Sequence, residues 1–196
     1  MNGFRIGLLC GAFIFSCGAA DAQTNMRIRG TITAFDGKVL SVKSRDGKDL
    51  KLQFPENGAV VAAKAITLAD LKPGDYVGVT TIRREGVLTA REVHTIPRAV
   101  PEGYIPWDLE PESGMTNANI AKAVKSASGH ELTLEYKGGS QTIHVPDGTP
   151  IVTTVPADRA LLTPGTYIFT GAQVAADGTI TTTRIQAARD GVKPPQ

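Results

Sequence analysis

The chain contains few of the residues that form cross-links, metal centres or catalytic groups. Of its 196 residues, two are cysteine, three are histidine and one is tryptophan. Both cysteines, Cys10 and Cys17, lie close to the N-terminus, so the sequence after them excludes a disulfide and a thiolate metal site. Acidic and basic residues nearly balance at a net charge of +2, and no basic stretch resembles a nucleic-acid footprint. We therefore expect no nucleic-acid partner.

Residues 1–22 have the order of features of a secretory signal peptide. Arg5 supplies a short positive segment, and residues 6–15 form an apolar run too short to span a bilayer. Ala20-Asp21-Ala22 then offers the small-x-small pattern that signal peptidase requires, so we expect cleavage before Gln23. The sequence thus predicts a periplasmic or secreted protein. No later segment approaches the length of a transmembrane helix, and we expect none in the exported chain.

A second processing route is open at Cys17. The stretch Ile14-Phe15-Ser16-Cys17 loosely resembles a lipoprotein cleavage box, which would anchor the chain through this cysteine. Phe15 is bulky for its position in such a box, and the Ala-x-Ala site lies just beyond it. A soluble exported protein is therefore the favoured interpretation.

The sequence after the leader repeats itself. Residues 27–97 align with residues 119–189 at an offset of about 92. Leu71-Lys72-Pro73-Gly74-Asp75-Tyr76-Val77 then lies over Leu162-Thr163-Pro164-Gly165-Thr166-Tyr167-Ile168. A shared Leu-x-Pro-Gly-x-Tyr at equivalent places indicates two copies of one unit. We expect the copies to occupy residues 24–97 and 119–190.

Each copy has the pattern of five strands with a short connector after the third. In the first copy the strands are expected over residues 27–35, 38–45, 49–54, 76–83 and 87–96; in the second they begin near Ile120, Glu131, Ser140, Tyr167 and Thr179. This order is typical of an OB-type barrel, and closure removes the exposed edges of so small a sheet. The sequence predicts an all-β protein of two tandem OB-like barrels, each folding on its own core, with an open two-sheet sandwich as the alternative.

Alternation of apolar and polar residues predicts that Leu40, Val42, Leu132 and Leu134 face the core. It also predicts the register of two hairpins. Pairing Val42 with Leu52 leaves the loop Asp46-Gly47-Lys48, and pairing Leu134 with Ile143 leaves the loop Gly138-Gly139. Between the copies, residues 98–118 form a proline-rich linker with large apolar groups, which we expect to pack against one or both barrels. Residues 191–196 end in Pro194-Pro195-Gln196 and are expected to be a disordered tail.

The turn and core residues resemble a bacterial family of exported β-repeat proteins of unknown function. The resemblance rests on Asp36-Gly37, on the stretch from Leu71 to Val77 and on Gly86-Val87-Leu88-Thr89-Ala90, once per repeat. It implies an envelope location and an OB-like unit, and it carries over no catalytic residue. Because Thr166 replaces Asp75 in the second copy, a role that needs this carboxylate could reside only in the first.

The histidines are weak candidates for a metal site. His130 and His144 lie on one predicted hairpin beside acidic residues, and His94 ends the last strand of the first copy. A metal centre usually needs three or four convergent ligands, whereas this pattern assembles at most an imidazole and carboxylates. Surface histidines are the simpler interpretation.

Trp107, Met115 and Met26 suggest a second metal hypothesis. Thioether and imidazole ligands suit Cu(I), and a small exported barrel with Trp, Met and His superficially resembles periplasmic copper chaperones. The methionine spacing of those chaperones is absent, so a purely hydrophobic role for Trp107 and Met115 is favoured.

The linker supplies the remaining candidates. Asp108, Glu110 and Glu112 alternate with apolar residues and could in principle serve acid–base chemistry or bind Ca²⁺, but a solvated edge fits an extended segment better. Tyr104, Trp107 and Asp108 are weak candidates for binding a partner. No nucleophile, base and oxyanion donor occur together, so we expect neither an enzyme nor a cofactor.

Two functions therefore stay open. The favoured one is a non-catalytic module of the cell envelope that binds another envelope protein or a cell-wall component. The alternative is a protein that handles a small ligand or a metal such as copper or zinc, through His130, His144 and Trp107.

Overall fold

The computed structural model describes residues 24–126 and 129–195, and the predicted signal peptide over residues 1–22 lies outside them. The described chain is all-β, as the sequence predicts, apart from two 3₁₀ turns over Leu68–Asp70 and Arg159–Leu161. Across these residues, no helix has the length and apolar character needed to cross a membrane.

The strands of the first repeat and the linker are β1 (Thr24–Phe35), β2 (Val39–Ser44), β3 (Asp49–Gln53), β4 (Ala59–Ala65), β5 (Tyr76–Arg84), β6 (Val87–Thr95) and β7 (Gly103–Pro106). Those of the second repeat are β8 (Gly114–Ser126), β9 (Gly129–Tyr136), β10 (Gly139–Pro146), β11 (Ile151–Pro156), β12 (Tyr167–Val174), β13 (Ile180–Thr181) and β14 (Arg184–Ala187).

Five of these strands close into a barrel, which we call the second lobe. Its pairings run β5–β6–β10–β9–β8 and return from β8 to β5. Alternate residues along each strand point inward, as period-two geometry requires. The resulting core joins β-branched and leucine side chains from both repeats: Val77, Val79, Val93, Ile120, Leu132, Leu134, Ile143 and Val145.

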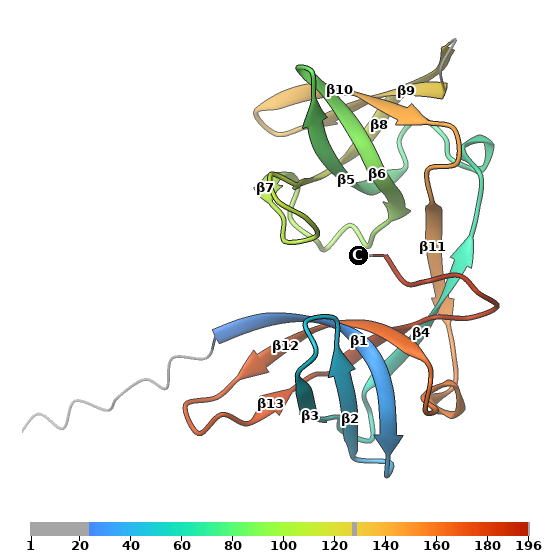
Figure 1. Ribbon diagram of the computed structural model, residues 1–196. Coiled ribbons are helices and arrows are strands. Elements are labelled where there is room, and N and C mark those ends of the chain that lie inside the picture. Colours follow the sequence, from blue (N-terminus) through green and yellow to red (C-terminus); the bar gives the residue numbers. More distant parts are fainter. Residues whose placement is uncertain (1–23, 127–128, 196) are drawn as a thin grey trace, which may run out of the picture.

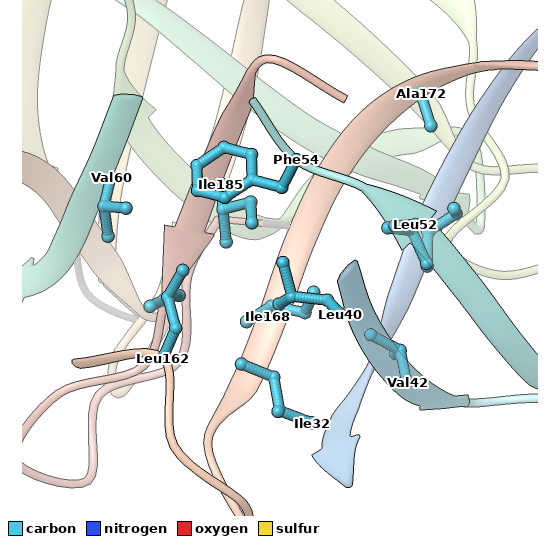
Figure 2. Packing of buried hydrophobic residues seen from close by; sticks show 12 residues of the cluster. Ile32, Leu40, Val42, Leu52, Phe54, Val60, Leu162, Ile168, Ala172 and Ile185 are labelled. Carbon is cyan, nitrogen blue, oxygen red and sulfur yellow. The ribbon is translucent and has the colours of Figure 1, made fainter. Parts of the chain in front are cut away.

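The remaining long strands form the first lobe, seen in the lower half of Figure 1. Its pairings run β1–β2–β3–β13–β12, with β12 returning to β1 and β14 added beside β12. Figure 2 shows the core of this lobe, in which Leu40 and Leu52 of the first repeat pack with Ile168 and Ile185 of the second.

The two repeats therefore exchange their ends, which corrects the expected tandem arrangement. The first three strands of each repeat pair with the last strands of the other, so neither 24–97 nor 119–190 contains a complete core. The crossing is made by β4 and β11, which pair with each other antiparallel from Val152–Ala65 to Pro156–Val61. Both segments pass from one lobe to the other (Figure 1). The alternation of side chains is the same whether a strand pairs within its repeat or outside it, and so did not reveal the exchange.

The two predicted hairpins form, each with a different register. Leu52 pairs with Leu40 rather than Val42, and Ile143 pairs with Leu132 rather than Leu134. Both shifts are by two residues, so every side chain keeps its predicted face. The turns move because Gly47 and Gly138 take the positive-φ positions, at 84° and 98°.

The C-terminal segment is ordered through Pro195, contrary to the expected disordered tail. Pro194 and Pro195 are buried, and the chain returns between the two lobes to end there (Figure 1). Gln196 lies outside the described residues. Burial of the two prolines, of which Pro195 lines a cavity between the lobes, explains why this segment is held in place.

Candidate binding groove between the two lobes

The linker is fixed to the first lobe by an ion pair between Arg29 and Asp108. Arg29 on β1 donates two hydrogen bonds to the Asp108 carboxylate, at 2.9 and 3.0 Å. The Arg29 side chain is only 2% exposed, whereas that of Asp108 is 44% exposed. Partial burial opposes ionisation of Asp108, but the hydrogen bonds and charge of Arg29, with a further contribution from Arg27, outweigh it and lower the pKa of the carboxyl below its ordinary value.

Trp107 joins the same contact. The Arg27 guanidinium lies 4.0 Å from the centre of the indole ring, and that of Arg29 lies 5.8 Å away. Arg29 also sits 4.9 Å from the ring of Phe169 on β12. Stacked guanidinium groups are attracted to the ring faces, so Trp107 and Phe169 are held as neighbouring walls at the edge of the first lobe.

The two lobes present equivalent sheet faces to each other. Thr31 pairs with Tyr167 just as Asn119 pairs with Tyr76, which makes β1 equivalent to β8 and β12 equivalent to β5. One row of three paired residues, at the same level on each face, differs in side-chain chemistry between the two lobes. In the first lobe it is Arg29, Phe169 and Gln186; in the second it is Asn117, Gly78 and His94.

A cavity of about 400 Å³ lies between these faces. Its walls come from β6, β7, β8, β11, β12, β14 and the chain end. Apolar groups include Val100, Ile105, Trp107, Met115, Phe169 and Pro195, and polar groups include His94, Asn117, Thr154, Arg184 and Gln186. Apolar walls with a few converging polar groups are the usual composition of a ligand site.

His94 is the buried titratable group of this cavity. Its Nδ1 atom lies 3.1 Å from a carboxylate oxygen of Glu92, without the geometry of a hydrogen bond. Gly78 on β5 makes room for the imidazole, because a Cβ there would come within 2.6 Å of Nε2 and within 3.2 Å of the side-chain oxygen of Asn117. The glycine thus provides the space that the His94 ring occupies beside Asn117.

A second cavity of about 720 Å³ continues the first along the same elements. Glu92 and Val152 line it, and two residues further along their strands His94 and Thr154 line the first cavity. The linker contributes Leu109 to one and Trp107 to the other. Because residues two apart on a strand share a face, the two cavities lie along the same face of β6 and β11, and together we call them the inter-lobe groove.

The sequence-predicted histidines do not come together. His130 pairs with Val145 and His144 pairs with Glu131, on adjacent rungs of the β9–β10 hairpin. Adjacent rungs project to opposite faces, so the two imidazoles cannot share a ligand. Within the described part of the chain, no group of three or more His, Cys, Asp or Glu residues is arranged to hold a metal ion.

The acidic residues of the linker are separated as well. Asp108 contacts Arg29, and Glu110 forms an ion pair with Arg91. Glu112 is exposed, in a turn with a positive φ of 61°. These carboxylates therefore serve different partners and do not form a cation site or an acid–base pair.

The remaining candidates divide between the groove and other places. Tyr104 on β7 is exposed and its ring covers Gly114. Trp107 and Met115 line the inter-lobe groove, whereas Met26 lines a separate hollow beside Asn25 and Arg27. The groove residues Phe169, Arg184 and Gln186 were missed from the sequence, because only the exchange of strands brings them opposite the first repeat. Their one sequence signal is that they match Gly78, Glu92 and His94 in the aligned repeats.

No known protein family matches the chain, and neither does a curated protein or a solved structure. The resemblance to exported β-repeat proteins stays a prediction.

Proposed function

We propose that this protein is an exported, non-catalytic module that binds an extended segment of another envelope macromolecule in the inter-lobe groove. The leader-like residues 1–22 support export. The proposal rests on the groove itself, which has apolar walls and a few buried polar groups and is lined by residues of both repeats and of the linker.

The chemistry of the lining favours binding over catalysis. Among the described residues around the smaller cavity, His94 and Arg184 are the titratable groups, and no serine or cysteine lines it; the Glu92 carboxylate, 3.1 Å from His94, lines the larger cavity. A hydrolytic or acyl-transfer site needs a nucleophile, a base and an oxyanion donor within reach of each other. A long groove of this kind suits a polymer that runs through it.

The shape of the groove supports an extended ligand. Strands β6 and β11 run parallel, with Ile151 paired to Val93, and they contribute residues at both cavities. A chain lying along them would meet Val152 and His94, which are paired, and then Thr154. Binding would desolvate apolar surface while the polar groups select orientation.

The test combines export and binding. We expect the full chain, secreted by a bacterial host, to be recovered from the periplasm with Gln23 as its first residue, as determined by mass spectrometry. The purified protein is then immobilised and exposed to a solubilised envelope fraction. Two exposed apolar residues provide matched variants: Ile105→Ser in the groove and Val87→Ser in the β5–β6 turn region, at 39% and 52% exposure.

A bound component retained by the parent and by Val87→Ser, but reduced at least about tenfold by Ile105→Ser, supports the proposal. Equal capture by both variants would place binding elsewhere on the surface. Recovery of the protein with residues 1–22 intact in the cytoplasm would contradict export.

A metal-handling protein is the second candidate, because the buried residues His94 and Met115 line one cavity. Imidazole and thioether ligands favour Cu(I). Elemental analysis of the periplasmic protein decides between the two: stoichiometric copper that is lost in both His94→Ala and Met115→Leu supports this candidate, and metal-free protein contradicts it.

A further inference from the structure

We propose that the inter-lobe groove binds extended, proline-containing peptide segments, and that the C-terminal segment 191–195 is a built-in occupant which such a partner displaces. This inference rests on the proposed function and specifies its ligand. Three features of the chain end support it: how it enters the groove, what it buries there and how it is held.

The chain enters the groove through a tight turn after β14. The amide of Ala188 still donates to the carbonyl of Tyr167 on β12, at 2.8 Å. Arg189 and Val192 then exchange two backbone hydrogen bonds, at 3.1 and 2.9 Å, around Asp190 and Gly191. Both central residues have positive φ, at 51° and 78°, as in the two-residue turns that reverse a strand. The chain is thereby turned back between the lobes.

The returning segment follows the length of the groove. Residues 191–193 line the larger cavity beside Glu92 and Val152, and Pro195 lines the smaller one beside Trp107 and Ile105. The segment thus runs in the same direction as β6 and β11. The segment therefore forms part of the lining of both cavities, and the open volume of each cavity adjoins it.

The residues that the segment buries are prolines. Pro194 and Pro195 are both buried, and Pro195 shares its cavity with the aromatic side chains of Trp107 and Phe169. A proline ring fixes φ near the value of an extended polyproline helix, so it loses little conformational freedom on binding. Grooves lined with aromatic groups recognise such segments in several unrelated domains. The chemistry of the groove and of its occupant therefore match.

Two of the contacts of the segment offer little resistance to release of the prolines. The ammonium group of Lys193 lies 5.1 Å from the centre of the Tyr167 ring, on a side chain that is exposed to solvent. A cation–π contact in water is weak, and the turn at Asp190 is closed by local hydrogen bonds that survive if the proline residues leave. Attachment to β14 gives the segment an effective concentration near the millimolar range, which a free peptide must exceed.

The experiment uses a fluorescein-labelled peptide with the sequence of residues 187–196, Ala-Ala-Arg-Asp-Gly-Val-Lys-Pro-Pro-Gln. Its fluorescence anisotropy is followed on titration with the full exported chain and with a chain that ends at Asp190. We expect the shortened chain to bind the peptide at least about tenfold more tightly, because the competing segment is gone. A peptide with serine at both proline positions should bind the shortened chain at least about tenfold more weakly.

The matched variants locate the binding. In the shortened chain, Ile105→Ser should weaken peptide binding, whereas Val87→Ser should leave it unchanged. A shortened chain that melts cooperatively but binds no peptide would overturn the proposal, as would equal affinity for the proline and serine peptides.

If the chain that ends at Asp190 does not fold, a full-length variant provides the same test. The full chain with Pro194→Ser and Pro195→Ser should bind the parent peptide at least about fivefold more tightly than the parent chain does. Unchanged affinity would overturn the proposal. If the labelled peptide does not bind while capture of the envelope component still depends on Ile105, the groove binds a ligand of different chemistry. In that case the proposed function stands without this inference.

Discussion

The guanidinium group of Arg29 and the carboxylate of Asp108, 79 positions apart in the chain, form a two-bonded ion pair whose arginine is buried and whose aspartate reaches the surface. This pair ties the linker between the repeats to the first strand of the first lobe. The linker also supplies β7, which pairs with β8 of the second lobe. The Arg29–Asp108 ion pair therefore couples the two lobes and fixes one wall of the inter-lobe groove.

We predict that Asp108→Asn destabilises the protein by about 1–2 kcal/mol, because it leaves the buried Arg29 cation with a neutral partner. The free energy of unfolding is measured by urea titration. Asp49→Asn is the matched control, since Asp49 pairs with Lys43 on an exposed surface and its loss should cost about 0–1 kcal/mol. Equal effects of the two substitutions would contradict the coupling role of Asp108.

The same carboxylate predicts how stability changes with pH. The pKa of Asp108 is lowered in the folded protein from its ordinary value of 3.8. Its contribution is therefore complete above that ordinary value and is lost as the pH falls through the lower folded-state pKa. We expect the difference in unfolding free energy between the parent and Asp108→Asn to shrink from about pH 5 to about pH 2. A difference that stays constant over this range would show that the ion pair is not its source.

Exchange of strands predicts that neither half folds alone. A cut between Pro111 and Glu112, in an exposed turn, gives one fragment with β1 to β7 and one with β8 to β14. Each fragment lacks half of both cores, so we expect far-UV circular dichroism and amide NMR spectra typical of unfolded chains, and recovery of the native spectrum on mixing. A cooperative melt of either fragment by itself would contradict the exchange.

Two glycine substitutions provide a paired test of backbone packing. A Cβ at Gly30 on β1 would overlap the backbone carbonyl of Lys43 on β2, whereas the nearest atoms to a Cβ at Gly114 belong to the exposed ring of Tyr104. The β2 backbone cannot move without breaking its ladder, but the tyrosine ring can rotate away. We expect Gly30→Ala to lower the melting temperature by several degrees more than Gly114→Ala, in a thermal scan. The reverse order would contradict the close approach of β1 and β2.

Local features of the fold followed from the sequence because they depend on neighbours in the chain. The two copies of Leu-x-Pro-Gly-x-Tyr predicted equivalent strand starts at Tyr76 and Tyr167, and both begin strands. The inward faces of Leu40, Val42, Leu132 and Leu134 are also as predicted. Alternation fixes the face of a side chain and says little about which strand lies beside it.

The exchange and the groove could not be predicted for that reason. Phe169 and Gln186 line one cavity with His94 and Asn117 only after β1 pairs with β12 and β5 pairs with β8. The sequence alignment also set Asn119 opposite Arg27, whereas strand pairing makes it equivalent to Thr31. The longer β8–β9 hairpin causes this shift. Burial of the tail was missed because two prolines and a glycine suggest disorder unless a surface is known to receive them.

The described chain begins with β1 and its last strand is β14, and both belong to the first lobe. If an anchor held the N-terminal end while a partner pulled on the C-terminal end, the tension would pass from β14 through β12 to β1, and the antiparallel pairing of β1 with β12, from Thr24–Val174 to Thr31–Tyr167, would be loaded in shear. The second lobe would lie outside that line of force and keep its closed barrel while the first bears the strain.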